Sequence, residues 1–160
     1  MSENSVRIIE LPPMRVASAL GFGEAPEGAA WEKLFGFLHK KDLWDEMESL
    51  SYYGFNNPDP TPASPNYGYE QWVTVPEKVD GDQEITIKMF GGGLYAVSRC
   101  VGIPNIFSAW RSLFAWREDS PYLPGTHQWL EKWVNPVKGE QSEKEMIMDL
   151  YIPIIKSTLQ

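Results

Sequence analysis

Glu131 stands between two tryptophans in a segment with the alternation of a β-strand, HQWLEKWVN (127–135). A period of two places Trp129, Glu131 and Trp133 on one face of that strand. A carboxylate between aromatic rings can recognise a lipophilic cation, because the rings supply apolar area and cation–π attraction and the acid supplies charge. Burial there would also favour the protonated acid and suit it to general acid or base catalysis. The structural alternative is an edge strand with an exposed glutamate beside half-buried indoles.

Tyr151 is the second residue that could take part in chemistry, in the last expected strand, MIMDLYIPI (146–154). If the last two strands pair antiparallel, one face could bring Tyr151 near Glu131 or Trp133, although the sequence does not define the register. A tyrosine in that place would hydrogen-bond a developing oxyanion while the carboxylate activates water.

Aromatic residues are abundant, with 7 Trp, 7 Tyr and 7 Phe among 160 residues. For any one of them, packing in the core is the plainer role, but their number favours an aromatic-walled cleft. Besides the residues around Glu131, the candidates for its walls are Trp110 and Phe107 in the second half, and Tyr53 and Trp72 in the first.

Composition excludes several classes of protein. With 22 acidic against 14 basic residues and a net charge of −8, direct binding to nucleic acid is not expected, since that affinity comes from Lys and Arg neutralising phosphates. One cysteine (Cys100) and two distant histidines (His39, His127) predict no disulfide, no metal site and no cofactor. No apolar run approaches the roughly 20 residues of a membrane span. The first residues resemble no secretory signal, so a cytoplasmic protein is expected.

The first half of the chain alternates extended and helical patterns. Residues 6–22 are expected to be extended, with a break at a Pro-Pro pair that cannot donate to a sheet. Apolar residues at the spacing i, i+3, i+4 and i+7 predict a helix over 31–44. Aromatic strands are expected at 51–57 and 69–75, separated by a loop (58–68) whose four prolines forbid regular structure.

The second half repeats this order. Residues 84–90 alternate as a half-buried strand, and three glycines (91–93) are expected to turn the chain into 94–102, so that the two strands form a hairpin. A helix is predicted over 103–116. The two strands around Glu131 and Tyr151 follow, with a polar loop (136–146) between them.

These patterns predict an α+β fold of two pseudo-symmetric strand–helix–strand–strand units. The halves lie at about 1–80 and 81–160. Because neither sheet could bury its face well alone, the two are expected to pack as one domain over residues 1–160.

The order and spacing of the motifs resemble the GyrI-like, or effector-binding, domain over nearly the whole chain. The resemblance depends on the opening VRIIELPPMRVASALGFG, on YYGFNNPDP followed by YEQWVTVP, on GGGLYAVSRCVG before a helix, and on LEKWVNP followed by LYIPI. Such domains occur as the drug-binding half of multidrug-responsive transcription activators, in a DNA gyrase inhibitor protein, and as free-standing proteins.

The resemblance implies a ligand cleft between two units related by a pseudo-two-fold, with lipophilic and often cationic compounds bound around a buried glutamate. That glutamate corresponds to Glu131, and the tyrosine of the family's final strand corresponds to Tyr151. Two positions depart from the family pattern. An acidic pair is Asn56-Asn57 here, and Trp133 replaces a more usual tyrosine. The second change removes a phenol that could donate a proton, which weakens a hydrolase interpretation more than a binding one.

The sequence therefore favours a small-molecule binding protein that senses or sequesters a xenobiotic, with Glu131 as counter-charge for a lipophilic, cationic or aromatic ligand. The first alternative is a hydrolase of cyclopropanoid or other electrophilic xenobiotics that uses Glu131 and Tyr151. The second is a protein-interaction module that, like the gyrase inhibitor it resembles, meets a basic partner through its acidic surface. The ligand's identity and the oligomeric state do not follow from the sequence.

Overall fold

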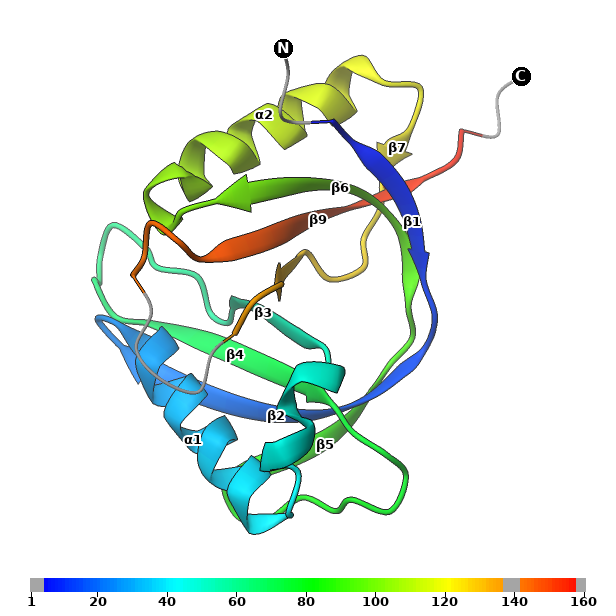
Figure 1. The fold of residues 1–160 in the computed structure, drawn as a ribbon. Helices are drawn as coiled ribbons and strands as arrows, with labels where there is room; N and C mark the ends of the chain where they lie inside the picture. The colour runs from blue at the N-terminus through cyan, green and yellow to red at the C-terminus, as the bar shows by residue number, and fades with distance from the viewer. Residues whose placement is uncertain (1–4, 137–141, 158–160) are drawn as a thin grey trace. The chain divides into compact units, whose positions relative to one another are not determined.

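The computed structural model describes residues 5–136 and 142–157, which form two compact units. One comprises Met14–Phe90 and the other Met1–Pro13 with Gly91–Gln160; they are called the 14–90 unit and the 91–160 unit below. Each contains an antiparallel sheet with one long helix against it (Figure 1). Part of the expected polar loop, residues 137–141, lies outside the described residues.

The 14–90 unit has four strands in the order β5-β2-β4-β3. Its elements are β2 (Met14–Gly23), α1 (Pro26–Lys40), the 3-10 helix η1 (Trp44–Ser49), β3 (Tyr52–Asn56), β4 (Tyr67–Thr74) and β5 (Ile85–Phe90). The helix expected over 31–44 begins earlier, at Pro26, a residue that suits a first helical turn. It ends at Lys40, because the chain leaves the helix through Asp42, whose φ is 60°.

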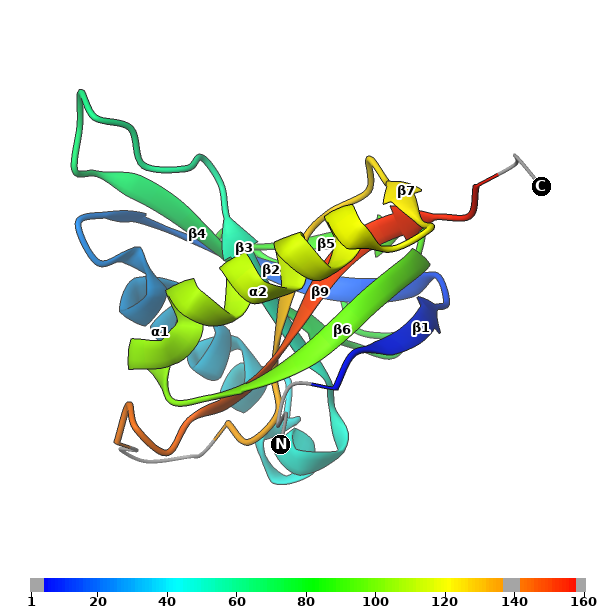
Figure 2. The same cartoon turned by 90° about the horizontal axis from the view of Figure 1, so that it is seen from above.

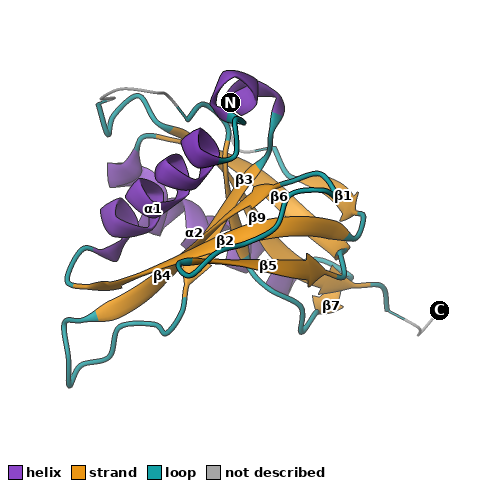
Figure 3. Ribbon diagram, turned by 90° about the horizontal axis from the view of Figure 1, so that it is seen from below, coloured by secondary structure: helices purple, strands orange, loops and turns teal. Residues whose placement is uncertain are grey.

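Helix α1 packs closely on β2 and β4, as the view in Figure 3 shows. Its apolar stripe, including Ala30, Leu34 and Phe37, is at most 2% exposed. A Cβ on Gly21 of β2 would lie 2.2 Å from the carbonyl oxygen of Pro26. Only glycine therefore allows the start of the helix to approach the strand so closely.

The ladder defines which side chains lie on the other face of this sheet. Directly opposed residues in antiparallel strands share a face, and Gly21 is opposite Tyr69, so the row of Tyr69 faces α1. The neighbouring row holds Ser18 opposite Trp72, with Glu70 two residues before that tryptophan. These side chains therefore lie on the helix-free face of the 14–90 unit.

The 91–160 unit has the same architecture, with the strand order β1-β6-β9-β8 and β7 paired to β9. Its elements are β1 (Arg7–Leu11), β6 (Gly93–Val101), the 3-10 helix η2 (Ile103–Asn105), α2 (Ile106–Asp119), β7 (Leu123–Pro124), β8 (Leu130–Trp133) and β9 (Ile147–Ile155). Helix α2 runs along β6 and β9 (Figure 2). Leu113 of α2 packs with Ala96, Cys100 and Leu150 in the core beneath the helix.

The two units therefore repeat one pattern, β2-α1-β3-β4 and β6-α2-β8-β9, each with one added edge strand. Buried and exposed positions follow the same order along β2 and β6 over the nine residues of β6. The predicted α+β class and the two strand–helix–strand–strand units are confirmed.

The predicted hairpin between the strands at 84–90 and 94–102 is wrong. β5 pairs with β2, and β6 pairs with β1 and β9. As a result, β1 belongs to the 91–160 unit and β5 to the 14–90 unit, which differs from a division near residue 80. Period-two alternation identifies a strand but not its partner. The Pro12-Pro13 break separates β1 from β2 and lets each join a different unit.

Candidate functional site

Glu131 lies on β8, beneath helix α2. One of its carboxylate oxygens accepts a hydrogen bond from the indole N–H of Trp110 on α2, with Nε1 3.1 Å from Oε2. In the ladder Glu131 is opposite Leu150, which belongs to the core packed against α2. Glu131 is therefore half-buried on the helix-covered face of the 91–160 unit.

Two further tryptophans lie beside this pair. The ring of Trp129 is 5.4 Å from that of Trp110 at a tilt of 40°, and Trp129 is 37% exposed. Trp133, two residues after Glu131 and on its face, packs against the core under α2. Trp129 precedes the strand instead of lying within it. The structure nevertheless gathers the acid and the three predicted indoles on one side of the unit.

Helix α2 carries more aromatic surface in the same row. Phe107, Trp110 and Phe114 are spaced i, i+3 and i+7, which puts them along one side of the helix. Phe107 is 71% exposed, with the Arg111 guanidinium 5.6 Å from its ring centre. Phe107 thus lies on the surface of α2 and contributes nothing to the core.

The negative charge of Glu131 affects the pKa of a cysteine in the core beneath it. Cys100 of β6 is buried and has no disulfide partner. Burial raises the pKa of its thiol, and the carboxylate of Glu131 raises this pKa further. The thiol is therefore protonated at neutral pH and acts as a small apolar group.

Tyr151 does not share a face with Glu131. Its ladder partner on β8 is Leu130, so Tyr151 points to the helix-free face of the 91–160 unit. There it is 3% exposed, and its ring is 5.3 Å from that of Tyr95, in an edge-on arrangement. Burial raises the pKa of Tyr151, and the nearby charge of Asp149 raises it further. The register thus excludes the arrangement that would place this phenol beside the carboxylate.

Tyr53 and Trp72 belong to the 14–90 unit and lie opposite each other on β3 and β4. Both are buried on the helix-free face. The ring of Trp72 contacts those of Phe55 and Phe90, at 5.1 and 5.3 Å. Trp72 also donates its indole N–H to a second carboxylate, that of Glu70, which the sequence analysis missed.

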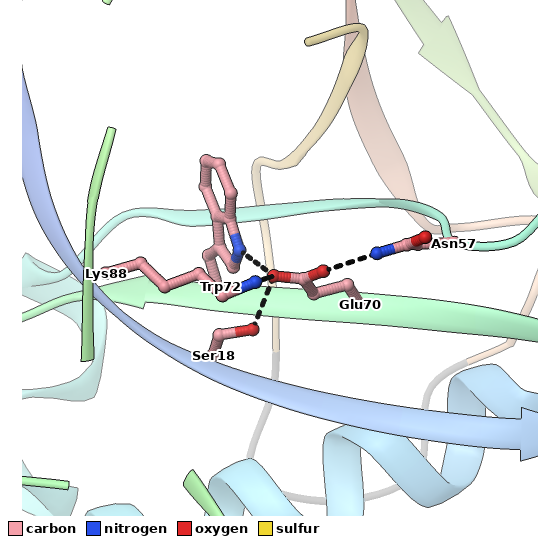
Figure 4. Close-up of polar contacts among 5 residues, drawn as sticks. All are labelled: Ser18, Asn57, Glu70, Trp72 and Lys88. Carbon is pink, nitrogen blue, oxygen red and sulfur yellow. Dashed lines mark hydrogen bonds and ion pairs between the residues drawn. The ribbon is translucent and has the colours of Figure 1, made fainter. Parts of the chain in front are cut away.

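Glu70 is 2% exposed and accepts four hydrogen bonds (Figure 4). The donors and their distances are Ser18 Oγ at 2.7 Å, Trp72 Nε1 at 2.7 Å, Asn57 Nδ2 at 3.0 Å and Lys88 Nζ at 2.5 Å. Burial alone would raise the pKa of Glu70, but these four donors outweigh it and hold the pKa below its ordinary value. Glu70-Gln71-Trp72 repeats the spacing of Glu131-Lys132-Trp133, and this repeat is the signal that could have revealed it.

Asp149 is a third buried carboxylate, 5% exposed, in the 91–160 unit. Arg99 donates to it from Nε and Nη2, at 2.9 and 3.2 Å, and Arg7 Nη2 lies at 3.2 Å. Burial acts to raise the pKa of Asp149, but the two arginines outweigh it and lower the pKa. Like Glu70, this residue is held ionised by its neighbours. It shares the helix-free face with Tyr151, two residues later.

Within residues 5–136 and 142–157, no three His, Cys, Asp or Glu side chains are grouped closely enough to hold a metal ion. The helices in that same part of the chain are too short or too polar to cross a membrane.

A family described as "Cass2: Integron-associated effector binding protein" matches residues 7–154. This match confirms the resemblance to effector-binding domains. No curated protein sequence matched the chain.

Solved structures share the fold at low identity. In the EcmrR–DNA complex, the match covers 98% of this chain and 59% of EcmrR, at 14% identity and a TM-score of 0.73. The isolated EcmrR C-terminal domain is similar over 96% of this chain and 99% of that domain (16% identity, TM-score 0.72). An integron cassette protein from the mobile metagenome of Vibrio cholerae aligns over 94% of this chain and 95% of its own (12%, 0.56). SAV2435 bound to tetraphenylphosphonium aligns over 94% of both chains (9%, 0.52).

Proposed function

The chain belongs to the family of integron-associated effector binding proteins, and from this premise we propose that it binds lipophilic organic cations at Glu131. The observation that carries the proposal is the hydrogen bond from Trp110 to Glu131 beside the ring of Trp129. It joins a carboxylate to an aromatic surface on one face of one unit.

The chemistry of this surface suits a flat or globular cation with aromatic substituents. Aromatic faces attract a cation by about 0.5–2 kcal/mol each, and more strongly where water is excluded. Trp110 and Trp129 supply two such faces, and Glu131 supplies a formal negative charge in a half-buried place. A neutral ligand of the same shape would gain the apolar contact but not the charge term.

The biological role that we propose is sensing or sequestering a xenobiotic. The EcmrR structure is a complex with DNA, and SAV2435 is seen with the cation tetraphenylphosphonium. The tetraphenylphosphonium complex supports an effector-binding role for this fold, and the DNA complex supports a role in sensing. The hydrolase alternative has less support, because Tyr151 faces away from Glu131 and Trp133 stands where the family usually has a tyrosine.

Two ions of the same shape and opposite charge test the proposal. Tetraphenylphosphonium and tetraphenylborate each place four phenyl rings around one central atom. Titration calorimetry should show the phosphonium bound at least about tenfold more tightly than the borate, which corresponds to about 1.4 kcal/mol. Equal affinities, or a preference for the borate, would overturn the role of Glu131 as counter-charge.

A further inference from the structure

Arg117, in the last turn of α2, is a buried cation that forms no ion pair with any residue among 5–136 and 142–157. It is 5% exposed, and its Nη1 donates to the carbonyl oxygen of Pro153 at 3.0 Å. Its Nε–H has no hydrogen-bond partner among the described residues. None of the ion pairs found in that part of the chain includes Arg117. A buried charge in this state is costly unless an acceptor reaches it.

The guanidinium lies next to the aromatic surface at Glu131. Its central carbon is 5.2 Å from the ring centre of Phe114 and 5.4 Å from that of Trp129. Trp129 in turn contacts Trp110, which donates to Glu131. The pair of indoles therefore connects a positive group, Arg117, to a negative one.

We propose that this site selects dipolar aromatic compounds, with a positive group toward Glu131 and a carboxylate or carbonyl oxygen toward Arg117. The inference rests on the proposed function and adds to the site a second group, Arg117, that would bind an oxygen acceptor of the ligand. Trp129 lies outside any strand and is partly exposed, and the proposal requires its indole to turn so that a ligand can reach the guanidinium.

Electrostatics gives such a ligand an advantage over a simple cation. An oxygen acceptor would supply the missing partner of Nε–H through a charge-assisted hydrogen bond. A ligand that carries only positive charge gains nothing at that end, and Arg117 repels it. Arg117 is therefore a specificity-determining residue, whereas Glu131 provides the attraction common to all cationic ligands.

Rhodamine B and its ethyl ester form a matched pair of probes. Both carry the same aromatic cation, and only rhodamine B has a free carboxylate. The wild-type chain should bind rhodamine B about fivefold or more tightly than the ester, measured by fluorescence anisotropy. Arg117→Met should remove this preference by lowering the affinity for rhodamine B. The affinity for the ester should stay the same or rise. Arg117→Lys, which keeps the charge, should retain more of the preference than Arg117→Met.

The outcomes separate this inference from the proposed function. Equal binding of the two dyes by the wild-type chain, or tighter binding of the ester, overturns the role of Arg117, and this result needs no variant. An Arg117→Met variant with the wild-type preference overturns it as well. If binding of the ester depends on Glu131 but rhodamine B binds no more tightly than the ester, the proposed function stands. Only the role of Arg117 then fails. If neither dye binds, both fail.

Discussion

Glu70 of β4 and Asp149 of β9 occupy equivalent positions in the two units. Each lies on the third strand of an identically ordered sheet, at most 5% exposed on the helix-free face. Each is paired with a cation from the added edge strand, Lys88 of β5 or Arg7 of β1. In each unit, therefore, an ion pair to a buried carboxylate joins the added edge strand, which lies outside the strand–helix–strand–strand repeat, to its sheet.

The Lys88–Glu70 pair should stabilise the 14–90 unit. Lys88→Met leaves a buried carboxylate without its cation, which we expect to lower the free energy of unfolding by about 2 kcal/mol. The double variant Glu70→Gln with Lys88→Met should recover part of this loss, since no buried charge is then left unpaired. Urea unfolding measures both. As a control, Lys40→Met breaks an exposed pair with Asp82 and should lower the free energy of unfolding much less than Lys88→Met, because solvent screens an exposed pair. Equal losses in the two lysine variants would contradict the account.

Acid should destabilise the chain through Glu70 and Asp149. The folded-state pKa of each is lowered, so their stabilisation is complete above the unfolded carboxyl pKa of about 4 and is lost as pH falls through the folded pKa. Asp149→Asn should therefore give a shallower loss of unfolding free energy below about pH 4 than the wild type shows. Asp59→Asn, at an exposed carboxylate, is the matched control for the change of side chain. Identical slopes for wild type and Asp149→Asn would count against the ionised, buried carboxylate.

Tyr151→Phe should leave ligand binding intact, because Tyr151 is on the opposite face of the sheet from Glu131. The affinity for tetraphenylphosphonium should stay within about twofold of the wild-type value, measured by calorimetry. A loss of tenfold or more would show that the phenol takes part in the site and would revive the hydrolase interpretation.

Two glycines of the 14–90 unit should respond in opposite directions to alanine. In Gly21→Ala the new Cβ meets the backbone oxygen of Pro26, so we expect a loss of about 2 kcal/mol or more in unfolding free energy. In Gly36→Ala, within α1, the new Cβ meets nothing within 4 Å. We therefore expect the free energy of unfolding to rise by up to about 1 kcal/mol, because alanine favours a helix more than glycine does. Thermal unfolding of both variants is the test, and a tolerated alanine at Gly21 would contradict the close packing of α1 on β2.

Periodicity predicted the two long helices and the long strands but not η1 or β7, and one motif predicted the core of the candidate site. The i, i+3, i+4 pattern located α1, and the alternation around Glu131 placed Trp133 on its face. The partner of each strand could not be predicted in this way, because a period of two specifies faces and not neighbours. The hairpin between β5 and β6 and the possible proximity of Tyr151 to Glu131 both failed for that reason.

The buried polar clusters needed the fold itself. The donors to Glu70 come from β2, β4, β5 and the residue after β3, and Ser18 is 52 positions away in the sequence. Asn57, noted as a departure from the family's acidic pair, is one of those donors. Arg117 appears in the sequence as an ordinary basic residue near the end of a helix. Only its packing between Phe114 and Trp129 shows that it is buried.

In the proposed site, Glu131 supplies charge and Trp129 supplies apolar contact. Trp129→Ala should therefore lower the affinities for tetraphenylphosphonium and tetraphenylborate by similar factors, because both ions lose contact with the same indole ring. Glu48→Gln, at an exposed acid of η1, removes the same formal charge elsewhere and should leave both affinities unchanged.

The most direct measurement is the ratio of the two affinities in Glu131→Gln. We predict that this variant binds tetraphenylphosphonium about tenfold more weakly than the wild type and binds tetraphenylborate as well or better, so that the preference for the cation disappears. A Glu131→Gln variant that keeps the wild-type ratio would contradict the account.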